Sequence, residues 1–169
     1  MNPPPRSKAR SHSGEPFRVV PMQHSTVNVT FLRRSEFELS PVYQRESNLW
    51  NTEKKQLLID SLLNRYDIPK IYLHTLPSVT SKSSSRYSVI DGKQRLLSIW
   101  GFLSDEFPLA DDFVCLRDPA IQAQGMTFSK LNKHYPIVAA ELLATPLPIM
   151  IVETEEMELI EDLFSRLNE

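Results

Sequence analysis

The stretch that most constrains the fold is Tyr87 to Leu103, YSVIDGKQRLLSIWGFL, where an apolar run ends at a short charged cluster and resumes with a different period. Tyr87, Val89 and Ile90 have the aromatic and β-branched character of a buried strand. The dipeptide DG is a turn signal, and after it leucine, isoleucine and tryptophan recur at helical spacing. The pattern predicts a strand, a tight turn and a helix, with the cluster DGKQR at the start of the helix.

A helix start of this composition suits a phosphate. The first N–H groups of a helix lack intrahelical acceptors and carry the positive end of its dipole. Gly92 lets the backbone approach a ligand, Lys93 and Arg95 add positive charge, and Arg95 can donate to two oxygens at once. Gln94 adds a neutral donor. Asp91 would repel a phosphate unless a cation or a hydroxyl lies between them, so it is a candidate ligand for Mg²⁺ or a ribose.

An ordinary helix start is the alternative interpretation of the same five residues. Asp is a favoured N-cap, Gly is a common turn residue, and Lys, Gln and Arg are frequent in an exposed first turn. The residues alone leave both interpretations open. The phosphate site is favoured at one point, because a helix prefers acids in its first turn and this one has two cations there.

Three further stretches carry a resemblance to a known family. They are Tyr43-Gln44-Arg45 followed by Trp50, Leu62 to Leu73 (LLNRYDIPKIYL), and Phe164 to Asn168 (FSRLN). Together with Asp91 to Leu96 they resemble four segments of the GmrSD-type N-terminal domain family, which follow one another in the same order along the chain. These segments are the YQR-x-W opening, a helix with an IP turn and a strand, the DGQQR signature and the FxRLN segment. The resemblance runs over roughly residues 42 to 169 and is more specific than any single motif.

The resemblance implies a fold and a function. The family has the ParB/sulfiredoxin-like fold, binds nucleoside triphosphates and serves bacterial systems that restrict modified phage DNA. The nuclease is usually a separate C-terminal domain, so any nuclease activity is expected outside this chain. The interleaved strands and helices of the sequence independently indicate a small mixed sheet packed with helices, an α+β domain.

The resemblance also assigns roles to residues. It implies a nucleoside triphosphate and Mg²⁺ as cofactors, and a slow triphosphate phosphohydrolase if the chain is an enzyme. The expected catalytic residues are Asp91, Gln94 and Arg95, with Asp91 also the metal ligand. The expected nucleotide-binding residues are Gly92, Lys93, Arg95, Gln44, Arg45, Arg166 and Asn168. Lys93 replaces the usual Gln of the family, which favours phosphate binding but could displace the metal.

A DNA-binding module is the alternative function. Tyr43, Gln44 and Arg45 offer an aromatic ring, an amide and a guanidinium, which can stack on a base and bind a base edge or a phosphate. In this interpretation they read modified DNA, and the DGKQR turn grips a DNA phosphate without nucleotide turnover. The net charge of -2 requires that any polyanion bind at a local patch.

Length and composition predict one domain in the cytoplasm. Residues 1–16 are rich in Pro, Ser and cations and are expected to form a disordered arm, and residues 17–169 to form the domain, truncated at its C-terminal side. A lone Cys115 suits a reducing compartment, and no apolar run is long enough to span a bilayer. The expected partners are a C-terminal nuclease domain or subunit, and a second copy of the chain.

The remaining elements follow from periodicity. Alternation of Val27, Val29 and Phe31 with polar neighbours predicts a half-buried strand. A helix is expected to start at Asn51 or Thr52, with Leu57, Leu58, Leu62 and Leu63 as its buried stripe. Further elements are expected as strands over 70–75 and 146–152, a helix from Thr127 interrupted at Pro136, and a helix over 155–167.

Overall fold

A computed structural model describes residues 17–39, 49–76 and 85–169 of the chain. The strands are β1 (Arg18–Pro21), β2 (Phe37–Glu38), β3 (Ile71–Thr75), β4 (Tyr87–Asp91) and β5 (Ile149–Glu153). The helices are α1 (Val27–Leu32), the short 3-10 helix η1 (Arg34–Glu36), α2 (Thr52–Leu63), α3 (Lys93–Leu103), α4 (Phe128–His134), α5 (Pro136–Ala144) and α6 (Met157–Leu167).

The five strands form one mixed sheet in the order β1-β5-β3-β4-β2. The central strand β3 pairs antiparallel with β4 and parallel with β5. At the edges, β1 is antiparallel to β5 and β2 is parallel to β4. With six α-helices among the described residues, this architecture confirms the predicted α+β class.

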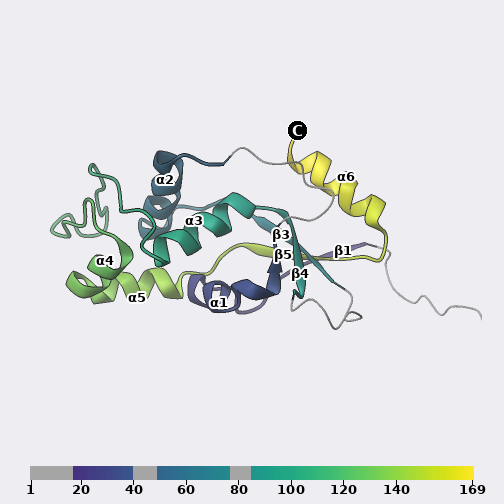
Figure 1. Ribbon diagram of the computed structural model, residues 1–169, viewed down its shortest axis with the longest axis horizontal. Coiled ribbons are helices and arrows are strands. Elements are labelled where there is room, and N and C mark those ends of the chain that lie inside the picture. The colour runs from purple at the N-terminus through teal and green to yellow at the C-terminus, as the bar shows by residue number, and fades with distance from the viewer. Residues whose placement is uncertain (1–16, 40–48, 77–84) are drawn as a thin grey trace, which may run out of the picture.

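The two faces of the sheet are covered by different helices. On one face Leu73, Val89 and Ile151 join the main core, which also contains buried side chains of α2, α3 and α5. On the other face Ile90 and Val152 form a smaller cluster with Ile160 of α6. In Figure 1, α6 accordingly lies apart from the other helices, beside the sheet and away from α4 and α5.

A β-bulge on β4 lies next to the central motif. Tyr72 pairs with Asp91 and Leu73 pairs with Val89, so Ile90 has no partner residue on β3. Bulges of this kind locally bend a strand and re-aim its side chains. The bulge therefore falls directly before the Asp91-Gly92 turn.

The predicted strand over residues 26–31 is wrong, because this segment is α1. The Thr26 side chain caps the helix by accepting a hydrogen bond from the Val29 N–H at 3.3 Å. The buried residues are Val27 and Thr30, which are three apart, as on one face of a helix. Capping and burial override the β-propensity of the valines, and the first strand lies earlier, over Arg18–Pro21.

The predicted helix and strand in the next part of the chain are confirmed as α2 and β3. The N-cap of α2 is Asn51, whose side chain accepts from the Lys54 N–H at 2.9 Å. The buried stripe was predicted with one error, since Leu57 is 66% exposed and Ile59 is buried instead. The predicted strand at 146–152 and the helices near 127, 136 and 155 are confirmed as β5, α4, α5 and α6.

Candidate functional site

Gly92 forms the turn between β4 and α3. It is the N-cap residue of α3 and has φ of +99°, in the left-handed region that favours glycine. It is buried, and a Cβ at this position would lie 2.8 Å from Cγ1 of Ile71 on the neighbouring strand. Both the conformation and the close packing therefore require glycine here. A glycine has no side chain to cap the helix, and no acidic residue lies in the first turn of α3.

Arg95 joins three segments at this turn. Its Nη2 donates to Oδ2 of Asp91 at 2.6 Å and to the backbone carbonyl of Lys70 at 3.0 Å. The side chain is 13% exposed, and that of Asp91 is 26% exposed. The guanidinium thus links the first turn of α3 to the end of β4 and to the residue before β3. Its Nε is buried and has no hydrogen-bond partner among the described residues.

Gln94 connects the turn to the residue that precedes α2 by two positions. Its Oε1 accepts a hydrogen bond from the Trp50 N–H at 3.3 Å. The Trp50 ring in turn lies under the ammonium group of Lys54, 4.6 Å from its centroid. The cluster DGKQR and Trp50, whose contact with Gln94 spans 44 residues of sequence, therefore meet in the structure.

The comparison with known families agrees with these motifs. A family model described as GmrSD restriction endonuclease, N-terminal domain, matches residues 29–169. The chain belongs to this family. No curated protein and no solved structure matches the chain, so the ParB/sulfiredoxin-like fold stays a prediction.

Other predicted site residues of this GmrSD N-terminal domain lie at the end of α6 or outside the described residues. Tyr43, Gln44 and Arg45 fall outside the described residues. Arg166 lies at the end of α6, where its Nε donates to Oδ2 of Asp162 at 2.8 Å. Asn168 donates from Nδ2 to the Phe164 carbonyl at 2.7 Å. These two contacts stay within the last turns of the chain, and the predicted role of Arg166 and Asn168 at the nucleotide remains a prediction.

Two of the predicted site arginines, Arg166 and Arg95, form local ion pairs. The pKa of Arg166 is raised from its ordinary value because Asp162 accepts its hydrogen bond and carries the opposite charge. At the turn itself, Arg95 and Asp91 form an i,i+4 ion pair. Lys93, the second cation of the DGKQR cluster, is half-buried at the first position of α3.

A metal ion would find only part of its ligands here. Oδ2 of Asp91 is already bonded to Arg95, which leaves Oδ1 as the carboxylate oxygen for a cation. No group of three or more His, Cys, Asp or Glu side chains that could hold a metal occurs among residues 17–39, 49–76 and 85–169. Mg²⁺ is commonly held by one or two carboxylates together with substrate phosphates. Among the described residues, Asp91 could therefore supply one carboxylate ligand of such an ion.

Sequence reasoning missed three features of the site. The contact of Gly92 with Ile71 and the bond from Arg95 to the Lys70 carbonyl join segments about 20 to 25 residues apart, so no local pattern reveals them. The pairing of Asp91 with Arg95 could have been found, because the predicted turn at Gly92 brings a carboxylate just before the helix close to a cation in its first turn. In the described residues, no helix is long and apolar enough to cross a bilayer.

Proposed function

We propose that this domain binds a nucleoside triphosphate, with the phosphates at the Gly92 turn and the start of α3. The observation that carries the proposal is the helix start itself: a side-chain-free, left-handed N-cap, a lysine at the first helical position and no acid in the first turn. A helix start of this kind favours an anion through its dipole and its first N–H groups. Membership of the GmrSD restriction endonuclease N-terminal domain family supports a role in a restriction system.

The roles of the charged residues follow from their contacts. Lys93 and Arg95 both bring positive charge to this turn, and the guanidinium of Arg95 also holds Asp91 and the Lys70 carbonyl. Arg95 then contributes by positioning, because its guanidinium ties the first turn of α3 to Asp91 and to the Lys70 carbonyl. Asp91 would present Oδ1 to a Mg²⁺ ion carried by the triphosphate. Gln44 and Arg45 of the preceding segment are the proposed further contributors.

Binding is supported better than turnover. Hydrolysis needs a group that orients the attacking water, and Asp91 or Gln94 would have to provide it. One oxygen of Asp91 is bonded to Arg95, and Oε1 of Gln94 is bonded to the Trp50 N–H. Both groups already serve the architecture of the turn. We therefore propose a nucleotide sensor whose phosphohydrolase activity, if present, is slow.

Calorimetric titration with ATP, GTP, CTP and UTP, each with and without Mg²⁺, tests the proposal. Lys93→Ala should weaken binding roughly 10- to 100-fold, because a hydrogen bond to a charged group contributes about 1.5–3 kcal/mol. Lys130→Ala is the matched control, since Lys130 is an exposed lysine on α4. The proposal is overturned if the wild type binds no triphosphate, or if the two lysine variants bind equally well.

Recognition of modified DNA is the second candidate, favoured by membership of a restriction endonuclease family. In this proposal Tyr43, Gln44 and Arg45 contact the DNA, and the Gly92 turn holds one of its phosphates. Mobility shifts with modified and unmodified duplexes at two salt concentrations should then show a salt-dependent complex. Absence of a shift at the lower salt concentration would leave only the nucleotide proposal.

A further inference from the structure

The exposed side of α2 presents one apolar side chain among polar ones, and two more exposed apolar residues lie in the segment beside it. Leu57 on α2 is 66% exposed, and Val114 and Leu116 in the segment after α3 are 50% and 57% exposed. Leu57 and Asn64 are seven residues apart, which places them on the same side of the helix. Asn64 receives a hydrogen bond from the Leu116 N–H at 2.8 Å and donates to the Val114 carbonyl at 2.9 Å. The three apolar residues therefore follow one side of α2.

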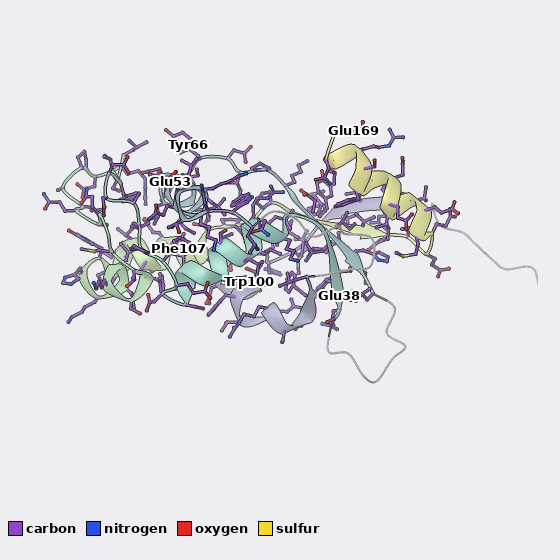
Figure 2. All side chains as sticks on the ribbon, turned by 45° about the horizontal axis from the view of Figure 1, so that its top comes forward. Glu38, Glu53, Tyr66, Trp100, Phe107 and Glu169 are labelled. Atoms are coloured by element: carbon purple, nitrogen blue, oxygen red, sulfur yellow. The ribbon has the colours of Figure 1, made fainter. Side chains whose placement is uncertain are left out.

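This surface is preformed, because the segment beside α2 is fixed to it at both ends. Besides the two bonds of Asn64, the Gln56 side chain donates from Nε2 to the Pro108 carbonyl at 3.0 Å. Phe107 and Phe113 of the same segment are buried in the main core. Figure 2 labels Glu53 on α2 and Phe107 in this segment. A groove with a volume of about 520 Å³ lies between α2 and residues 110–112 of this segment, and its walls do not depend on a bound ligand to take shape.

The groove is anionic. Its lining contains Glu53, Gln56, Leu57, Asp60, Ala110, Asp111 and Asp112. None of the ion pairs among the described residues includes one of its four carboxylates. The two lysines of α2 lie against aromatic rings, Lys54 at 4.6 Å from the Trp50 centroid and Lys55 at 5.9 Å from the Phe107 centroid. Four negative charges thus surround one exposed leucine.

We propose that this acidic groove, defined by Glu53, Leu57, Asp60, Asp111 and Asp112, is a docking site for a Lys- and Arg-rich segment of a partner protein that inserts a large apolar side chain against Leu57. Charge complementarity selects the partner, because four carboxylates repel nucleic acid and nucleotides and attract cations. The apolar centre selects a peptide over a simple cation, since an apolar core with a charged rim is the usual anatomy of a protein interface. This inference uses residues outside the Gly92 turn and stands independently of the proposed nucleotide binding.

The test measures binding of a labelled synthetic helical peptide of lysine and leucine by fluorescence anisotropy. A peptide with glutamate in place of each lysine is the negative control. The double variant Asp111→Lys/Asp112→Lys should weaken binding by about tenfold or more, since each close charge contact contributes on the order of 1 kcal/mol. The matched control, Glu158→Lys/Glu161→Lys on α6, changes the net charge by the same amount at exposed positions outside the groove.

The outcomes separate a specific groove from a general charge effect. Loss of binding in the groove variant with little change in the α6 variant supports docking at the groove. Equal loss in both variants, or no loss in either, overturns it. A second pair tests the apolar contact: Leu57→Ala should weaken binding, whereas Leu32→Ala, at a leucine that is 67% exposed on α1, should not. Both leucines are exposed, so neither substitution should unfold the domain.

Discussion

Replacing Gly92 by alanine tests the structural basis of the site. Two independent penalties meet at this residue. Its φ of +99° is a conformation that alanine adopts poorly, and the new Cβ would lie 2.8, 3.0 and 3.1 Å from three side-chain atoms of Ile71. Ile71 is fully buried in the main core, so it has little room to give way.

The expected cost is the sum of the two penalties. A left-handed conformation costs a residue with a Cβ about 1–2 kcal/mol. Crowding of a well-packed core by an extra methyl group costs about 1–3 kcal/mol. Gly92→Ala should therefore lower the free energy of unfolding by about 2–5 kcal/mol, a large part of the roughly 5–15 kcal/mol of a typical domain. Urea denaturation followed by circular dichroism measures it.

Two other glycines among the described residues offer matched controls. Gly125 has φ of +65°, but a Cβ there would meet its nearest atom, Oδ1 of Asp111, only at 3.4 Å, so Gly125→Ala should cost about 1–2 kcal/mol. Gly101 lies inside α3, and its Cβ would meet the flexible end of Glu106, so Gly101→Ala should be neutral or stabilise by up to about 1 kcal/mol. If Gly92→Ala costs no more than Gly125→Ala, the packing of the turn on Ile71 is not as described.

Two further substitutions test the charged contacts. Arg95→Met should lower the free energy of unfolding by about 1–3 kcal/mol, because Asp91 and the Lys70 carbonyl lose their donor. Arg95→Lys should restore part of this loss. Equal stability of Arg95→Met and the wild type in urea denaturation would show that these two hydrogen bonds do not stabilise the fold. The pKa of Asp105 is lowered by hydrogen bonds from the Ser129 side chain and N–H. The contribution of Asp105 to the stability of the fold is therefore present above the unfolded-state pKa and is lost as pH falls through the lowered folded-state pKa. Asp105→Ala should therefore cost about 1 kcal/mol near neutral pH and progressively less in acid, and a pH-independent difference in urea unfolding would contradict this account.

The strand, turn and helix around DGKQR could be predicted from the sequence, and the structure places them at Tyr87–Asp91, Gly92 and Lys93–Leu103. Local signals decide such an element, because period-2 and period-3.6 patterns meet at a glycine turn. The alternating valines near residue 27 failed as a signal, since six residues fit both periods and a threonine cap decided for the helix.

Tertiary contacts could not be predicted in the same way. The sequence shows Leu57 at a helical spacing that fits burial, but only the folded chain shows that α2 turns Ile59 inward and leaves Leu57 at the acidic groove. Likewise, Arg95 has the chemistry of a phosphate ligand, and only its packing shows that Asp91 and Lys70 occupy its Nη2. Composition identifies which groups are present, whereas long-range contacts decide which of them remain available to a ligand.

The hydrophobic clusters on both faces of the sheet reach the strand that leads to the proposed phosphate site. Val89 belongs to the main core, and Ile90, the next residue, packs against Ile160 of α6 on the opposite face. Because the bulge leaves Ile90 outside the register with β3, the position of Asp91 depends on the packing on both faces of the sheet. Gly92 then rests on Ile71, and Arg95 ties the helix back to β4. A turn held in this way is preorganised, so little binding free energy would be spent on ordering it around a phosphate.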